Sequence, residues 1–295
     1  TLNAKAKMRG LVVWLFYRLF RLLLRPFLFL RSWLRWLDIY WLSSLIDKKY
    51  EPLFEKYNPD LLVIHSVHEL TAVPVARVAQ RKNVPSLGIV TSWDNLTNKV
   101  EIYARCQKLI VWNPVMKNQA VQYHDYQDKD IFVVGTPQFD FYFQTPKDIF
   151  SREEFFTKLG LDFNKKLILY TTVPERIGGE AEMKAINTIY EAIISNGLVF
   201  PAQLLIRIYT KDDPHRYKHL ENLKDLVLYD PAKDGRYVSY VETERYFYKQ
   251  LATMVRYADA VVNVASTISI DAAIFDRPVV NVAFGKQKHW YETTH

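Results

Sequence analysis

The chain has 295 residues, 49% of them hydrophobic and 15% aromatic, which is enough to form one large or two ordinary domain cores. This composition excludes a disordered protein, and 9 glycines with a single cysteine exclude a collagen-like chain and a disulfide scaffold. The net charge of +7 comes from the first 37 residues, which contain no acidic residue, and the rest of the chain is near neutral. We therefore expect no nucleic-acid partner.

The segment from Met8 to Ile46 is rich in Leu, Phe and Trp and is interrupted by arginines. Its longest uncharged run, Leu11 to Tyr17, is far shorter than the roughly 20 residues of a membrane-spanning helix, and arginines throughout argue against a signal peptide. We expect residues 1–46 to be a basic aromatic helical arm that lies in the headgroup layer of an anionic membrane, at its cytoplasmic face. The residues predicted to bind this membrane are Arg18, Arg21, Arg25, Arg31, Trp33, Arg35 and Trp36.

A second interpretation of this arm stays open. On a helix that breaks at Pro26, the arginines share a face while aromatic side chains occupy others. Such a helix pair can also pack against the body of the protein, with its arginines extended to solvent or paired with acidic residues.

Short β-branched runs alternate with helix-length segments after Tyr50. Strands are predicted over 61–65, 87–91, 108–112 and 131–134, and helices over 72–81, 100–104 and 114–123. This alternation is typical of parallel βαβ units in an open sheet. It predicts an N-terminal α/β domain over residues 47–145.

A second α/β series follows after Gly160. Strands are predicted over 167–171, 203–209, 226–228, 260–264 and 279–284, and helices over 180–196, 244–257 and 267–275. Between the two series, Ser151 and Glu154 form the pattern of a capping box. We assign residues 146–295 to a C-terminal domain, expect it to be truncated, and expect a ligand cleft between the two domains.

The most informative motif is ADAVVNVASTISIDAAIFDRPVVNV, residues 258–282, which reads as strand, hydroxyl-rich turn, helix and strand. Ser266, Thr267 and Ser269 lie where the helix begins, so hydroxyls and free backbone N–H groups favour a phosphate there. Asp271 follows one turn later, and a carboxylate suits ribose hydroxyls. The alternative is an ordinary helix cap with polar residues facing solvent.

This motif resembles the nucleotide-binding segment of GT-B glycosyltransferases, near the branch of CDP-glycerol glycerophosphotransferases and UDP-N-acetylglucosamine 2-epimerases. VVGTPQFD at 133–140 and LLIRIYTKDD at 204–213 are similar to further motifs of that family. The resemblance implies two Rossmann-like domains facing across a cleft, with Ser266 and Thr267 at the diphosphate, Asp271 at the ribose and Arg207 at phosphate or carboxylate. The chain lacks the glycine pair of the epimerases and has Tyr209-Thr210 where the family shows His-Pro.

Further candidates follow strands of both domains. Thr172 and Arg176 follow the first strand of the C-terminal domain and are predicted to bind donor phosphate, although a solvated crossover is equally compatible with the pattern. His65, His68 and Asp94 follow strands of the N-terminal domain, where a base must take a proton from the acceptor hydroxyl. Asp94 is the first choice of base; alternatively it caps the following turn.

We expect neither a metal nor a cofactor. His65-x-x-His68-Glu69 matches no zinc-binding helix motif, and Asp128-Lys129-Asp130 precedes its strand, which indicates a solvated turn. No Walker or G-x-G-x-x-G motif indicates ATP or NAD.

The sequence as a whole predicts a membrane-associated, metal-independent glycosyltransferase that moves a sugar from a nucleotide-activated donor to a lipid-linked or surface-glycan acceptor. Two alternatives use the same nucleotide site. One is a glycerophosphotransferase of the CDP-glycerol type, and the other is a non-catalytic nucleotide-sugar binding protein. A soluble 2-epimerase ranks third, because the basic arm argues against it.

Overall fold

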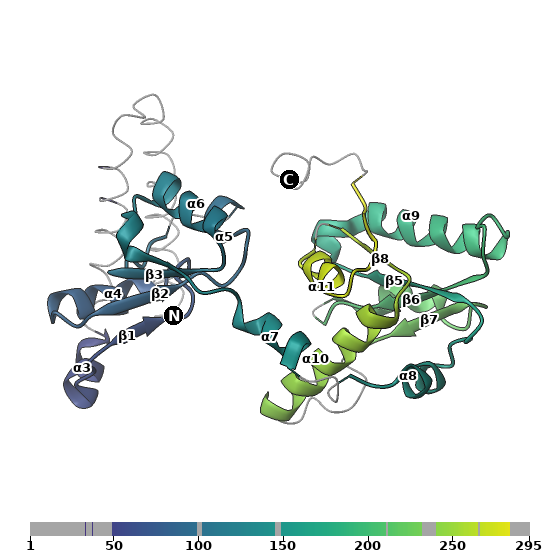
Figure 1. The fold of residues 1–295 in the computed structure, drawn as a ribbon, viewed down its shortest axis with the longest axis horizontal. Coiled ribbons are helices and arrows are strands. Elements are labelled where there is room, and N and C mark those ends of the chain that lie inside the picture. Colours follow the sequence, from purple (N-terminus) through teal and green to yellow (C-terminus); the bar gives the residue numbers. More distant parts are fainter. Residues whose placement is uncertain are drawn as a thin grey trace, which may run out of the picture. The chain divides into compact units, whose positions relative to one another are not determined.

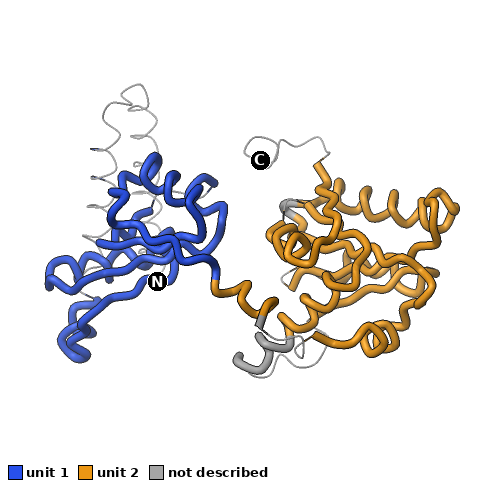
Figure 2. The backbone as a smooth tube through the Cα atoms, viewed as in Figure 1, with its two compact units in different colours: residues 1–136 blue, residues 137–295 orange. Residues whose placement is uncertain are grey.

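The computed structural model describes residues 33, 37, 49–98, 102–144, 149–210, 212–231, 240–264 and 266–283, with the backbone alone at 144, 176, 177 and 240–246. The chain divides between Thr136 and Pro137 into two compact units, unit 1 and unit 2 (Figure 2). The sequence predicted a boundary at residues 145 and 146. The helix between these two positions belongs to unit 2 because its Tyr142 ring packs edge-on against Phe275.

Unit 1 contains a four-stranded parallel sheet with the order β1-β2-β3-β4 (Figure 1). Its elements are α3 (Glu51–Tyr57), β1 (Leu62–Ile64), α4 (Ala72–Arg81), β2 (Ser86–Ile89), α5 (Asn95–Asn98), β3 (Lys108–Val111), α6 (Pro114–His124), η3 (Asp128–Asp130) and β4 (Ile131–Val133). The four predicted strands and two of the three predicted helices are confirmed.

The helix predicted over 100–104 is wrong. Helix α5 lies earlier in the chain, where the Asp94 carbonyl oxygen accepts the N–H groups of Thr97 and Asn98. Residues 102–104 are not helical, and Ile102 and Ala104 are buried in the core of the unit. Ile102, Tyr103 and Ala104 are successive apolar residues that are all buried, and the helix prediction rested on this apolar run.

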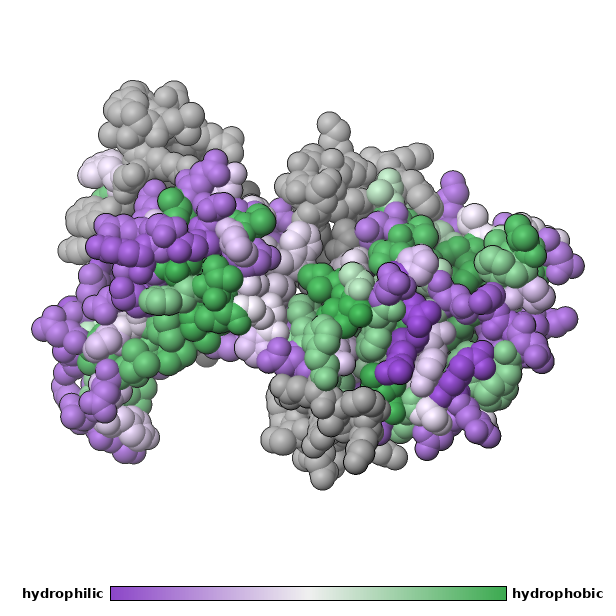
Figure 3. Space-filling model, viewed as in Figure 1, coloured by the Kyte–Doolittle hydropathy of each residue, from purple (hydrophilic) through white to green (hydrophobic). Residues whose placement is uncertain are grey.

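On the buried face of this sheet, Gly88 of β2 lies where the segment that follows β1 packs against the strands. The register pairs Ile64 with Gly88, Gly88 with Leu109, and Leu109 with Ile131. A Cβ atom on Gly88 would lie 2.5 Å from Cγ1 of Val67, so glycine permits the segment after β1 to pack onto the sheet. On the opposite face of this sheet, the apolar side chains of Val63 and Phe132 are about half exposed. The space-filling view shows hydrophobic side chains gathered on the surface of this unit (Figure 3).

Unit 2 contains a five-stranded parallel sheet with the order β7-β6-β5-β8-β9 (Figure 1). Its elements are α7 (Pro137–Gln144), α8 (Arg152–Leu159), β5 (Lys166–Thr171), α9 (Glu175–Ile194), β6 (Ala202–Arg207), η5 (Pro214–Leu220), β7 (Leu226–Tyr229), α10 (Tyr240–Tyr257), β8 (Ala260–Asn263), α11 (Ile268–Ile274) and β9 (Val279–Asn281). The five strands, the parallel pairing and the Ser151–Glu154 capping box are confirmed.

Helices cover both faces of this sheet because its strands have apolar residues at successive positions. Tyr170 and Leu204 face α9 and η5, while Leu169 and Leu205 face α8, α10 and α11. From β5 the chain first adds β6 and β7 on one side of the sheet and then returns to add β8 and β9 on the other side, so the strand order reverses between β5 and β8. The reversal marks the topological switch point, where ligands bind at the carboxyl ends of strands in doubly wound folds.

Within the described residues, no helix is long and apolar enough to cross a membrane. Of the predicted membrane-binding residues, only Trp33 is described, and half of its surface is exposed. The arginines of the arm lie outside the described residues. The membrane-binding arm and the cleft between the domains therefore stay predictions.

Candidate functional site

A row of polar side chains lies at the carboxyl ends of the central strands of unit 2. Thr171 ends β5, where the register pairs it with Arg207 of β6 and with Asn263 of β8. The three residues are 5%, 7% and 0% exposed, respectively. Because side chains alternate along a strand, they lie on the face of Leu169 and Leu205, beneath α10 and α11. We call these three residues the polar row; it crosses the switch point.

Asn263 holds the turn between β8 and α11. Its Oδ1 accepts the backbone N–H of Ser266 at 2.8 Å, and its Nδ2 donates to Oγ of Ser269 at 3.2 Å. Ser269 Oγ also donates to Oδ1 of Asn281 on β9 at 3.4 Å. The predicted phosphate residues Ser266 and Ser269 are thus fixed by a buried side chain of the polar row.

Thr267, the third hydroxyl of the predicted phosphate turn, is exposed and precedes α11 without forming a side-chain cap bond. Oγ of Ser266 instead accepts the N–H of Ile268, at 3.4 Å. The Thr267 hydroxyl is therefore not used in capping the helix.

Asp271 lies on α11 and is only 7% exposed. The hydroxyl of Tyr142, on α7, donates a hydrogen bond to its Oδ1. Burial raises the pKa of the Asp271 carboxyl, while the Tyr142 hydrogen bond and the charge of Arg207 act in the opposite direction. The Arg207 guanidinium lies 4.6 Å from the ring centre of Phe247 on α10. The structure thus brings the predicted residues Arg207 and Asp271 together.

The predicted donor loop after β5 has a different local structure from the one expected. Helix α9 begins at Glu175 rather than at residue 180, and it is interrupted at Gly179, whose φ of 49° and ψ of −137° favour glycine. Thr172 Oγ1 accepts the backbone N–H of Tyr209 at 2.8 Å, so it joins the loops after β5 and β6. The side chain of Arg176 lies outside the described residues, and its contact with phosphate stays a prediction.

A second buried polar cluster lies on the α9 side of the same sheet edge. Glu182, with no exposed surface, accepts the N–H of Val173 at 2.8 Å, and the Tyr217 hydroxyl lies 3.1 Å from its second oxygen. The Tyr217 hydroxyl also donates to Asp212 at 2.8 Å, and Arg216 lies 3.5 Å from Glu182. Burial is the main cause that raises the pKa of Glu182 to about 7. This cluster links the two loops that border the site.

The three base candidates of unit 1 follow the neighbouring strands β1 and β2. His65 is exposed, whereas His68 is 7% exposed and its ring lies 6.4 Å from that of His124, edge to face. The Asp94 carboxylate accepts a hydrogen bond from the Ser92 hydroxyl at 2.5 Å, and the Asp94 backbone carbonyl begins α5. The structure thus places all three residues at the carboxyl edge of the sheet of unit 1.

In the described part of the chain, no three His, Cys, Asp or Glu residues are grouped so as to hold a metal ion. The two aspartates of the D-x-D sequence lie on η3, where Asp128 pairs with Lys117 at 2.9 Å and Asp130 with Lys108 at 2.7 Å. Metal independence itself stays a prediction.

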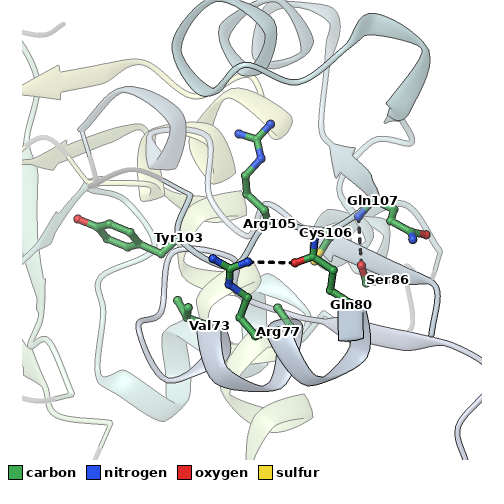
Figure 4. A pocket seen from close by; sticks show the side chains of 9 residues that line it. Val73, Arg77, Gln80, Ser86, Tyr103, Arg105, Cys106 and Gln107 are labelled. Atoms are coloured by element: carbon green, nitrogen blue, oxygen red, sulfur yellow. Dashed lines mark hydrogen bonds between the residues drawn. The ribbon is translucent and has the colours of Figure 1, made fainter. Parts of the chain in front are cut away.

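A cavity of about 380 Å³ in unit 1 is lined by Val73, Ala76, Arg77, Gln80, Ser86, Tyr103, Arg105, Cys106 and Gln107 (Figure 4). Ser86 begins β2, so this cavity lies toward the amino ends of the strands, away from the edge that holds the base candidates. Burial raises the pKa of the Cys106 thiol to about 11, so this thiol is protonated at neutral pH.

Solved structures with a similar fold include UDP-GlcNAc 2-epimerases. A UDP-GlcNAc 2-epimerase from Methanocaldococcus jannaschii is 16% identical and matches 81% of this chain and 65% of its own with a TM-score of 0.53. The UDP-GlcNAc 2-epimerase from Neisseria meningitidis bound to UDP-GlcNAc is 14% identical over 81% and 63%, with a TM-score of 0.57. The S. aureus MnaA-UDP co-structure is 13% identical over 82% and 61%, with a TM-score of 0.54.

These likenesses show the fold. The chain has the GT-B-like fold of the UDP-GlcNAc 2-epimerases, which is the fold that the sequence resemblance implied. It spans less than two thirds of the length of each of these three structures. No protein-family model and no curated protein matches the sequence.

Three residues of the candidate site in unit 2 were not predicted from the sequence. Thr171 and Asn263 each end an apolar strand, and such a polar residue at a strand end is the signal that indicates a site. Tyr142 gives no such signal, because it lies among the apolar residues of FDFYF.

Proposed function

We propose that the protein is a GT-B enzyme that uses a nucleotide-activated sugar and that unit 2 binds this donor at the polar row. The observation that best supports the proposal is the burial of Thr171, Arg207 and Asn263 side by side at the switch point, next to the Asp271 carboxylate. The Thr171 hydroxyl is buried and has no hydrogen-bond partner in the described part of the chain. A buried polar row of this kind suits a polar ligand better than an apolar one.

The proposed donor contacts follow from charge and position. The Arg207 guanidinium is the cation of the polar row, and it is suited to a diphosphate in place of a metal ion. Ser266, Thr267 and Ser269 supply hydroxyls at the turn that Asn263 holds. Asp271 supplies a carboxylate acceptor for ribose hydroxyls.

We propose that the reaction is transfer of the sugar to an acceptor hydroxyl. The acceptor oxygen bonds to the anomeric carbon, the bond to the nucleoside diphosphate breaks, and a base takes the acceptor proton. Asp94, His65 and His68 are the candidates for this base, because they lie at the carboxyl edge of unit 1. The likenesses favour a second candidate, a nucleotide-sugar 2-epimerase, for which a sugar product without any acceptor is the distinguishing result.

Nucleotide binding provides the first test. We expect one of UDP, GDP, CDP, CMP and TDP to raise the melting temperature of the protein in the absence of metal, since a ligand at 100 times its Kd stabilises by roughly 2.7 kcal/mol. Asp271→Ala removes the ribose acceptor and should abolish most of this shift. CDP as the best ligand favours the glycerophosphotransferase alternative, and UDP favours a sugar donor.

The matched control is Asp276→Ala, which removes an exposed carboxylate just after α11 and should leave the shift unchanged. Absence of a shift with all five nucleotides would contradict both the transferase and the binding-protein interpretations. If Asp94→Ala retains both the shift and the release of nucleoside diphosphate in the presence of acceptor, Asp94 is not the base.

We further propose that the arm of residues 1–46 holds the enzyme at an anionic membrane surface beside a lipid-linked acceptor. The support is its sequence, in which arginines and tryptophans alternate with apolar residues. Each basic residue near such a surface contributes about 1 kcal/mol. Replacing Arg18, Arg21, Arg25, Arg31 and Arg35 by glutamine should therefore lower binding to phosphatidylglycerol vesicles by more than about 100-fold in a sedimentation assay. Equal binding of the parent to neutral phosphatidylcholine vesicles would contradict the proposal.

A further inference from the structure

Helix α7 begins at the junction between the two units and contacts the proposed donor site. Its Tyr142 ring packs edge-on against Phe275, just after α11, with 5.4 Å between ring centres. On α7 itself, the same ring lies 5.9 Å from Phe141 and 6.2 Å from Phe139. These contacts aim the Tyr142 hydroxyl at the Asp271 carboxylate, to which it donates a hydrogen bond.

This hydrogen bond occupies the Asp271 carboxylate, which the proposed function assigns to the ribose hydroxyls. Asp271 is 7% exposed, so water can replace a lost donor there only poorly. A carboxylate oxygen that already accepts the Tyr142 hydroxyl is not equally available to a second hydroxyl from the same side. The phenol and the ribose hydroxyl are donors of the same kind, and one can replace the other without leaving the carboxylate unpaired.

We propose that the Tyr142 hydroxyl occupies the ribose position on Asp271 in the nucleotide-free protein and is exchanged for a ribose hydroxyl when a nucleoside diphosphate binds. The inference rests on the proposed function, and it adds a residue that sets the affinity of the site. Binding then has to break an existing hydrogen bond to a charged group. The cost of breaking this bond appears as a weaker apparent affinity.

Tyr142→Phe tests the exchange because it removes the hydroxyl and keeps the ring that packs on Phe275. We expect this variant to bind UDP or CDP roughly 10-fold more tightly than the parent in calorimetric titration, since its Asp271 has no competing donor. The control is Tyr257→Phe, which removes a hydroxyl that donates to the carbonyl of Phe150 and should leave the Kd unchanged.

The 2′,3′-dideoxy forms of UDP and CDP test whether the exchanged group is the ribose hydroxyl. These ligands have no donor for Asp271, so Tyr142→Phe and the parent should bind them equally. The proposal is overturned if Tyr142→Phe binds UDP and CDP no more tightly than the parent, or if its gain persists with the dideoxy forms. Binding of none of UDP, GDP, CDP, CMP and TDP to the parent or to either variant overturns the proposed function as well, which separates the two failures.

Discussion

Glu182→Ala is expected to lower the free energy of unfolding of unit 2 by roughly 1–3 kcal/mol, because a partner in a buried hydrogen-bonded cluster is removed. The change leaves the N–H of Val173 without its acceptor, while Arg216, whose side chain is 13% exposed, keeps its ion pair with Asp212. Urea unfolding followed by circular dichroism measures the loss. Glu180→Ala, at an exposed position of the same helix, should change the free energy by less than about 0.5 kcal/mol.

The pH dependence of the free energy of unfolding tests whether Glu182 is protonated in the folded protein. The Tyr217 hydroxyl lies within hydrogen-bond distance of both Asp212 and Glu182 but has only one proton to donate. A proton on Glu182 therefore supplies the hydrogen for the second of these two hydrogen bonds. Its pKa is raised from 4.5 to about 7, chiefly by burial, so between these values the folded protein binds the extra proton. The free energy of unfolding therefore falls as the pH rises from about 4.5 to about 7, by up to roughly 3 kcal/mol.

Glu182→Gln keeps the shape of the side chain and cannot ionise. The free energy of unfolding of the parent minus that of this variant should therefore decrease as the pH rises through this range. A difference that stays constant with pH would show that Glu182 is already charged in the folded protein.

Asn263→Ala should lower the free energy of unfolding by roughly 2–3 kcal/mol and weaken nucleotide binding at the same time. Asn263 has no exposed surface, and its removal leaves the N–H of Ser266 without its acceptor at the turn that precedes α11. Chemical unfolding and calorimetric titration with UDP and CDP measure the two effects. A loss of stability with unchanged nucleotide affinity would place the ligand away from this turn.

Asn281→Ala is the matched control for this change. Asn281 occupies the neighbouring register position on β9, is exposed, and accepts a 3.4 Å hydrogen bond from Ser269. Its loss should alter stability by less than about 0.5 kcal/mol. A comparable loss in both variants would mean that the whole edge of the sheet is weakened, rather than the Asn263 turn.

The strands and most helices were predictable because their signals are local. The helix over Ala72–Arg81 has the predicted bounds, and the Ser151–Glu154 capping box forms within a single turn. Asp271 is proposed as a site residue from its place one turn after the hydroxyl-rich segment, and its role stays a prediction. These features depend on neighbours within a few positions, which the sequence shows directly.

The missed features depend on pairs of residues that are distant in the sequence. Tyr142 and Asp271 are 129 positions apart, and nothing in the sequence around Tyr142 indicates a polar role. Glu182 lies in the predicted helix over 180–196, where it resembles a solvated residue until packing brings Tyr217, 35 positions away, onto it. Strand order also fixes which polar residues meet, because it places β8 rather than β7 beside β5.

The position of Cys106 makes the two units separately observable. It is the single cysteine of the chain, is 5% exposed, and packs in the core of unit 1. Its small exposed surface lies in the cavity of unit 1, so a thiol reagent added from solution reacts with it slowly in the folded unit and rapidly once unit 1 opens, whatever the state of unit 2. Labelling rates then report on the integrity of unit 1 while spectroscopy follows the whole chain. A substitution in the donor site can in this way be assigned to the unit it destabilises.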